Sequence, residues 1–167
     1  MCKYANSVLH GSPSRCLTRL QRIQNSVAMI VLQQPSLSSR DTLQQLHWLP
    51  VKWQIQFKLA SLTYKVIRTG TPSYLSERLH PYVLSRNLQS SSSANLHIPH
   101  NNIHFGSRSF HIAAPTVWNS LPSTLRSSQT LHNFRKHLKI HLFQLAFNSP
   151  KRLVQRLWFI LLNDYGA

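Results

Sequence analysis

VKWQIQFKLASLTYKVIR, residues 51–68, carries the clearest pattern in the chain. Apolar residues recur along it at helical spacing and fall on two opposite sides. One stripe comprises Val51, Ile55, Leu59, Leu62 and Val66, and the other comprises Trp53, Phe57, Ala60, Tyr64 and Ile67. A helix that is apolar on two sides packs against neighbours on both. This stretch therefore predicts a central helix that ends at Gly70 and Pro72.

Helical spacing also marks the segments before and after this stretch. Residues 17–33 have apolar side chains at positions 17, 20, 23, 27, 30 and 31. Residues 130–147 predict a second strong helix, whose apolar stripe comprises Leu131, Phe134, Leu138, Leu142 and Leu145. Residues 36–49 fit a shorter helix, with Ser39 or Asp41 as the candidate cap.

The segment between the two strong helices shows weaker patterns. Residues 85–93, SRNLQSSSS, predict a flexible break. Further along, polar residues separate the apolar positions Ile103, Phe105, Phe110 and Ile112. This alternation predicts a short β-hairpin turning near Gly106, or an irregular insertion near 94–112. Prolines in residues 113–127, AAPTVWNSLPSTLRS, indicate a structural corner. The expected fold class is a small, mainly α domain with that insertion.

Charge is the unusual feature of the composition. The chain has 167 residues, with 19 Lys and Arg against 3 Asp and Glu, for a formal net charge of +16. Such a chain attracts polyanions, so RNA or DNA is the expected partner and an anionic membrane surface is the weaker alternative. The candidate phosphate contacts are Lys58, Lys65 and Arg68 on one arc of the central helix, and Arg135, Lys136 and Lys139 on the second strong helix. Any single one of these bases is more often a solvated side chain.

Acidic residues are too few for most hydrolytic or phosphoryl-transfer sites. Asp41, Glu77 and Asp164 are far apart in sequence, which argues against metal-dependent phosphoryl transfer and paired-carboxylate hydrolysis. Neither acid nor cysteine accompanies the histidine groups, which are His97, His100 and His104, and His137 and His141. We expect no catalytic residue, no metal, no cofactor and no small-molecule substrate. A histidine-based hydrolase is the weakest alternative.

The sequence carries few signals for targeting, for disulfide bonds or for a membrane span. Cys2 and Cys16 form neither a disulfide framework nor a zinc pattern, and residues 1–17 lack the apolar core of a secretory leader. The longest apolar run, residues 157–162, is far shorter than the roughly 20 residues of a membrane span. We expect an intracellular protein of the nucleus or cytoplasm, not secreted and without a transmembrane segment. The sequence sets no oligomeric state.

Two long blocks resemble one family. They are LHWLPVKWQIQFKLASLTYKVIRTGTPSYLSERL (46–79) and RSFHIAAPTVWNSLPSTLRSSQTLHNFRKHLKIHLF (108–143). Both are similar to the C-terminal region, past the palm, of reverse transcriptases from LINE-type, non-LTR retrotransposons of the jockey-like kind. YANSVLHGSPSRCLTRLQRIQNSV (4–27) is similar to the same proteins, so the resemblance covers about residues 4–150.

The resemblance implies a division of the chain into consecutive regions. Residues 1–84 correspond to a helical, thumb-like region, followed by the break at 85–93. Residues 94–150 correspond to an extended segment with the C-terminal helix, and 151–167 form a basic and apolar tail outside the match. The family blocks match here at residues that look architectural, namely His47, Trp48, Pro50, Pro115, Trp118, Asn119 and Pro122.

The function implied by the resemblance is a truncated, non-catalytic fragment that retains RNA or DNA binding. The family's polymerase aspartates and its endonuclease do not map onto this chain. The alternative is a non-functional translated relic, or a structural or protein-interaction remnant without a nucleic-acid role. Neutral residues at Met29, Gln54 and Ser107, where the family usually carries charge, favour that alternative.

Overall fold

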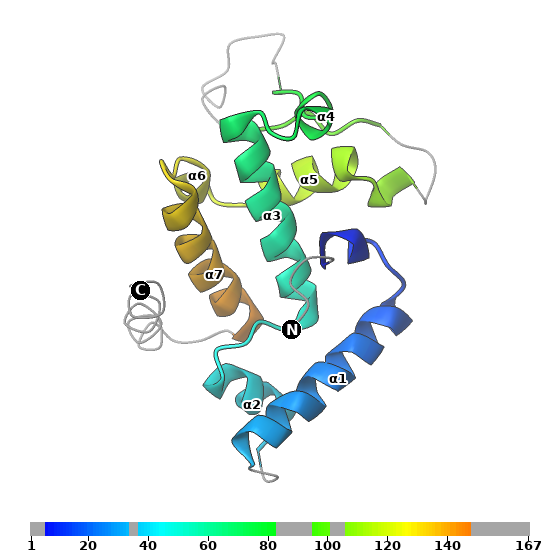
Figure 1. Ribbon diagram of the computed structural model, residues 1–167, viewed down its shortest axis with the longest axis vertical. Coiled ribbons are helices and arrows are strands. Elements are labelled where there is room, and N and C mark those ends of the chain that lie inside the picture. The colour runs from blue at the N-terminus through cyan, green and yellow to red at the C-terminus, as the bar shows by residue number, and fades with distance from the viewer. Residues whose placement is uncertain (1–5, 34–36, 83–94, 101–105, 148–167) are drawn as a thin grey trace. The chain divides into compact units, whose positions relative to one another are not determined.

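The structure is a computed structural model that describes residues 6–33, 37–82, 95–100 and 106–147. The described elements are η1 (Asn6–Leu9), α1 (Ser14–Leu32), α2 (Ser39–Gln45), α3 (Val51–Thr69), α4 (Ser73–Ser76), η3 (Gly106–Arg108), α5 (Phe110–Asn119), α6 (Ser123–Arg126) and α7 (Leu131–Phe147), as Figure 1 shows. No β-strand occurs in these ranges. The expected mainly α fold class is confirmed.

The contacts divide the chain into two compact units that interleave along the sequence. The first unit comprises Met1–Gly11 and Gln56–Arg135, and the second comprises Ser12–Ile55 and Lys136–Ala167. Two of the three boundaries fall inside helices, because α3 and α7 each contribute residues to both units. The regions expected from the sequence, 1–84, 85–93, 94–150 and 151–167, follow one another along the chain. The two units are defined by contacts instead, and each combines two separate stretches of the chain.

An aromatic cluster forms the centre of the first unit. The rings of Tyr64 and Phe134 stack with centroids 4.3 Å apart, and the Trp118 ring lies 5.9 Å from Phe134 and 6.4 Å from Tyr64. All three side chains are buried. Large aromatic side chains bury more apolar area than most others, so this cluster contributes strongly to the stability of the unit.

The long central helix α3 is buried on most of its circumference. Every member of the first predicted stripe is buried except Leu62, which is half-buried. In the second stripe Ala60 and Tyr64 are buried, whereas Ile67 is exposed near the end of the helix. Ser61 and Thr63 are buried as well, and the Thr63 hydroxyl donates to the carbonyl of Leu59 at 2.9 Å. The two apolar stripes of α3 therefore agree with a helix that has neighbours on more than one side.

In the second unit, α1 supplies polar groups to the start of α3. The Gln24 side chain is buried and donates to the Leu49 carbonyl at 2.8 Å. The Gln21 side-chain oxygen accepts from the backbone N–H of Val51 at 2.9 Å, and its amide donates to the Gln24 oxygen at 3.0 Å. The first N–H groups of a helix have no partner within the helix itself. Two glutamines of α1 therefore satisfy backbone groups at the beginning of α3.

Helix α2 packs against α1, and both of its ends have defined caps. The predicted cap was Ser39 or Asp41, but the observed N-cap is Ser38, whose side chain accepts from the backbone N–H of Asp41. At the other end His47 adopts a left-handed conformation with φ 53°. Its N–H bonds the Gln44 carbonyl, and the next N–H bonds the Leu43 carbonyl. This pair of bonds is a Schellman motif, which ends the helix.

The predicted β-hairpin over 94–112 is wrong for the described residues. Residues 95–100 are extended and irregular, and their one pairing is an isolated antiparallel bridge between Leu96 and Pro81. From Gly106 onward the chain is helical, so Phe110 and Ile112 belong to α5. Residues 101–105, which carry the other half of the alternation, lie outside the described residues, as do the predicted break at 85–93 and the tail at 151–167.

Two helices bury sides that their sequence patterns did not predict. In α1 the buried residues are Gln24 and Ala28, whereas the predicted apolar side is largely exposed. In α7 the predicted stripe is buried at Phe134, Leu138 and Leu142, but Leu145 is exposed. Ile140, Phe143 and Phe147 form a second buried side of α7. Helix α7 therefore resembles α3 in having neighbours on more than one side.

Candidate nucleic-acid interface

The basic residues predicted on α3 lie on one arc, and the structure gives them different environments. Lys65 and Arg68 are exposed, and Lys58 is half-buried. The Arg68 guanidinium donates to the Ser128 carbonyl at 3.0 Å, and it lies 5.6 Å from the centroid of the Tyr64 ring. Since the Tyr64 hydroxyl donates to the same carbonyl at 2.7 Å, Arg68 takes part in the packing of the loop that precedes α7.

The basic residues predicted on α7 are divided between the two units. Arg135 belongs to the first unit and is exposed, whereas Lys136 and Lys139 belong to the second and are half-buried. The positive charge of Lys139 lowers the pKa of His47, which shows that the two side chains are close enough to interact. The six predicted phosphate contacts therefore do not form one described site.

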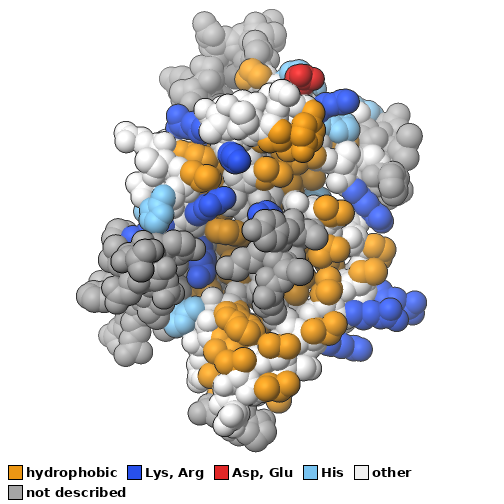
Figure 2. All heavy atoms as spheres, in the orientation of Figure 1, with side chains coloured by type: hydrophobic (Ala, Val, Ile, Leu, Met, Phe, Trp, Pro, Cys, Tyr) orange, Lys and Arg blue, Asp and Glu red, His pale blue; other side chains and the backbone are white. Residues whose placement is uncertain are grey.

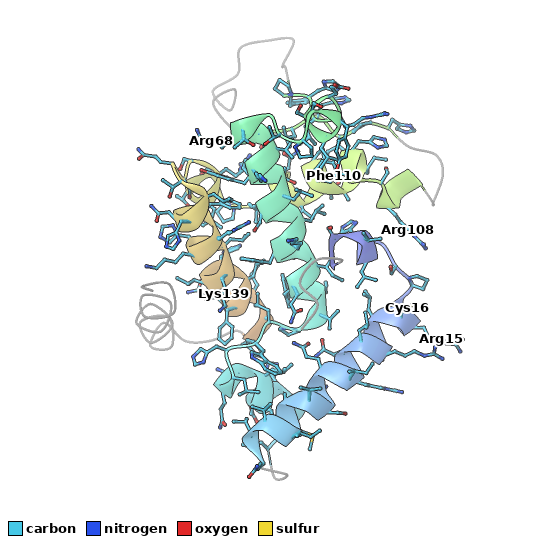
Figure 3. All side chains as sticks on the ribbon, in the orientation of Figure 1. Arg15, Cys16, Arg68, Arg108, Phe110 and Lys139 are labelled. Atoms are coloured by element: carbon cyan, nitrogen blue, oxygen red, sulfur yellow. The ribbon has the colours of Figure 1, made fainter. Side chains whose placement is uncertain are left out.

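The structure reveals a basic group that the sequence analysis did not select. Arg15, Arg19 and Arg22 lie along one side of α1, and all three are exposed. We call them the arginine stripe. Their i, i+4, i+7 spacing places them within about 10 Å along the helix axis. Among the described residues, their guanidinium groups have no hydrogen-bond or carboxylate partner. Figure 3 shows Arg15 extending away from the N-terminal end of α1.

The stripe could have been found from its spacing. Three arginines at positions 15, 19 and 22 share a helix face in a segment whose apolar spacing already predicts a helix. The three arginines are never adjacent in sequence, so they form no dense group of bases. Within the described part of α1 there is no acidic residue to pair with them, since its sequence is SRCLTRLQRIQNSVAMIVL.

The family-motif residues take structural positions. Pro115 lies inside α5 and is buried, and Trp118 is part of the aromatic cluster. The Asn119 side chain bonds the backbone of Leu96 twice, accepting from its N–H at 2.9 Å and donating to its carbonyl at 2.8 Å. Pro122 caps the start of α6. In the second unit, His47 and Trp48 form the Schellman motif, and the Pro50 carbonyl accepts the first bonds of α3.

The carboxylates and histidines do not gather into a reactive centre in the described ranges. Asp41 is engaged at the N-terminus of α2, where the Ser38 hydroxyl donates to it at 2.6 Å. Glu77 is exposed and belongs to the other unit. Within the described residues, no group of three His, Cys, Asp or Glu side chains is placed to hold a metal ion.

Three histidines have environments that favour the neutral ring. Burial lowers the pKa of His10 and of His141 below the ordinary 6.5. Burial also lowers the pKa of His47, and the charge of Lys139 adds to this effect, whereas a hydrogen bond to the backbone of Gln45 opposes it. The His47 ring stacks on Phe143 with centroids 5.9 Å apart.

Stability is expected to decline as pH falls below about 6.5. The unfolded chain takes up protons first, because the folded pKa values of these histidines are lower. His47→Asn removes one such group, and asparagine tolerates the left-handed backbone at that position. Urea unfolding of this variant should show a shallower loss of stability between about pH 7 and pH 5 than the parent does.

His80→Asn is the matched control for the pH experiment. It also removes one histidine, at an exposed position of the first unit. Its pH dependence should stay close to that of the parent. Equal slopes for the parent and for His47→Asn would show that His47 does not couple folding to pH.

In the described residues, no helix has the length and apolar character needed to cross a bilayer.

Comparisons with known proteins do not assign the chain to a family. No protein-family model matches the sequence, and neither a curated protein nor a solved structure matches it.

Proposed function

We propose that the chain is a non-catalytic segment of a LINE-type reverse transcriptase, from the region past the palm, and that it binds RNA or DNA through the phosphate backbone. The observation that carries the binding proposal is the arginine stripe. Three exposed guanidinium groups lie along one helix side in a chain of net charge +16. Arginine suits this role because its planar fork matches phosphate oxygens.

The spacing of the stripe fits a nucleic-acid backbone. One strand of a duplex presents a phosphate about every 3.4 Å along its axis, so a stripe about 10 Å long can contact about three phosphates. Such contacts release counterions, which makes affinity fall as salt rises. They carry no sequence information, so the proposed binding is of low sequence specificity.

Support for the family origin comes from the positions of its blocks. LTYK (62–65) and AAPTVWNSLP (113–122) meet in the first unit, where Tyr64 lies against Trp118. Support for a non-catalytic role comes from the separation of Asp41 and Glu77 into different units. We place the protein in the nucleus or cytoplasm, where RNA and DNA are available.

The test compares two variants that remove the same charge. Arg15, Arg19 and Arg22 are replaced by glutamine in one, and Lys58, Lys65 and Arg68 in the other. Affinity for a labelled RNA hairpin and a labelled DNA duplex is measured by fluorescence anisotropy at several salt concentrations. The first variant should lose about 2–3 from the slope of log affinity against log salt, because each phosphate contact contributes about 0.9.

The second variant should lose less of that slope, because Arg68 is held by Ser128 and Tyr64. Equal losses for the two variants would show that only the total charge matters and that the stripe is no site. A parent protein that stays folded but does not bind either probe at low salt would favour the alternative of a remnant without a nucleic-acid role.

A further inference from the structure

The side of α1 next to the arginine stripe exposes a row of aliphatic residues. We call this row the aliphatic strip; it comprises Leu20, Ile23, Val27, Ile30 and Val31. Ile23 is 61% exposed and Ile30 is 73% exposed, which is high for side chains of this type. The side of α1 that packs within its own unit carries Gln24 and Ala28 instead.

Helical geometry places the two rows beside one another. Each residue advances by about 100° around the axis, so positions 20, 23, 27, 30 and 31 lie on one side and positions 15, 19 and 22 on the adjacent side. Figure 2 shows hydrophobic side chains gathered over the lower part of the view, where Figure 1 places α1 and α2. Lys and Arg side chains lie beside them at the right.

A second copy of the chain is a poor occupant for this strip. Each copy carries a formal charge of +16, so two copies repel each other at close range. One side of a single helix offers a patch on the order of a few hundred Å², whereas a stable dimer buries about 800 Å² on each partner. Charge and area therefore both disfavour self-association through α1.

A protein groove is also less suited to the strip than a bilayer is. The centres of protein interfaces are enriched in aromatic side chains, and leucine and valine are under-represented among their strongest contacts. The strip is aliphatic along its whole length and contains no aromatic anchor, and the only charged residues of α1 are the three arginines. A bilayer needs no matching pocket, and anionic headgroups complement the arginines.

We propose that α1 is a membrane-surface helix that binds bilayers containing anionic lipid. The aliphatic strip enters the boundary between headgroups and acyl chains, while the arginine stripe contacts lipid phosphates. This geometry is that of an interfacial amphipathic helix lying in the plane of the membrane. The proposal does not depend on nucleic-acid binding, although the two ligands share the arginines and therefore compete.

Vesicle flotation with the full chain tests the proposal. The probes are vesicles of phosphatidylcholine alone and of phosphatidylcholine with about 30% phosphatidylserine, at near-physiological salt. The parent should bind the mixed vesicles and bind the neutral ones much more weakly. Ile23→Ser with Ile30→Ser should lower the partition coefficient at least tenfold, because two largely exposed isoleucines no longer enter the acyl boundary.

Val8→Ser is the matched control, since Val8 is 80% exposed but lies outside α1. It should change vesicle binding by less than about twofold. The paired isoleucine variant should also keep its affinity for the RNA hairpin, which separates failure of this proposal from failure of nucleic-acid binding. Folding of each variant is checked by circular dichroism and by the urea midpoint.

Three results would overturn the proposal. The first is equal binding of the mixed vesicles by the parent and by the paired isoleucine variant, which would leave only net charge as the cause. The second is no binding of the mixed vesicles by a folded parent. The third is a parent dimer in light scattering that becomes monomeric in the paired variant, which would make a second copy the occupant of the strip.

Discussion

Phe134→Ala is expected to lower the free energy of unfolding by about 3–5 kcal/mol. The Phe134 side chain is 0% exposed, and its ring stacks on Tyr64 and lies near Trp118. Removing it loses the transfer free energy of the ring and leaves a cavity among residues of three helices. A loss of this size is a large part of the roughly 5–15 kcal/mol that stabilises a domain.

Urea unfolding followed by tryptophan fluorescence measures this loss, since Trp118 is a neighbour of the replaced ring. Leu145→Ala on the same helix is the matched control, because Leu145 is 51% exposed and should cost less than about 1 kcal/mol. An unchanged midpoint for Phe134→Ala would mean that the aromatic cluster does not form the core of this unit.

Asn119→Ala is expected to release residues 95–100 from the first unit. The Asn119 side chain makes two bonds to the backbone of Leu96, and each lost bond leaves a partly buried group without a partner. Such groups cost about 1–3 kcal/mol each, so the two together should cost about 2–6 kcal/mol. Hydrogen exchange at the Leu96 amide should become at least tenfold faster, even where global stability falls less.

Asn119→Asp separates the two bonds. The carboxylate still accepts from the Leu96 N–H but cannot donate to the Leu96 carbonyl. Exchange at Leu96 should therefore lie between the rates of the parent and of Asn119→Ala. If both variants exchange at the parent rate, another contact holds this segment and the side chain of Asn119 is not its anchor.

The sequence predicted the strong helices because their apolar spacing is long and regular. Residues 51–68 and 130–147 became α3 and α7 with nearly the same bounds. The cap of α2 was misplaced by one residue, since Ser38 and Ser39 offer the same hydroxyl and only the backbone conformation distinguishes them. Periodicity locates a helix well and its first residue poorly.

The error over the β-hairpin had a different cause, which is that neighbours override local patterns. Phe110 and Ile112 alternate as in a strand, yet they begin α5, whose Ala113, Ala114 and Val117 are all buried. In α1 the apolar residues recur at helical spacing, but the residues that the contacts bury are Gln24 and Ala28. Periodicity shows that a helix has an apolar side; it cannot show which side meets the rest of its own chain.

The candidate interface was harder to predict than the helices. From the sequence, Arg68 is a candidate phosphate contact, and only the folded chain brings the Ser128 carbonyl to it across 60 residues. The arginine stripe was readable from spacing alone, although its members are never adjacent in sequence as Arg135 and Lys136 are. A basic side chain becomes a credible phosphate contact only when its exposure and its existing partners are known.

The interleaving of the two units limits what can be cut from this chain. Each unit is built from two stretches separated by the other unit, so no single contiguous deletion removes one of them whole and spares the other. A frameshift or an early stop codon before α7 would remove this helix from both units at once. In a gene that drifts without selection, one truncation damages both units, so the two should be lost together. In the laboratory, neither unit can be expressed alone as one uninterrupted natural segment.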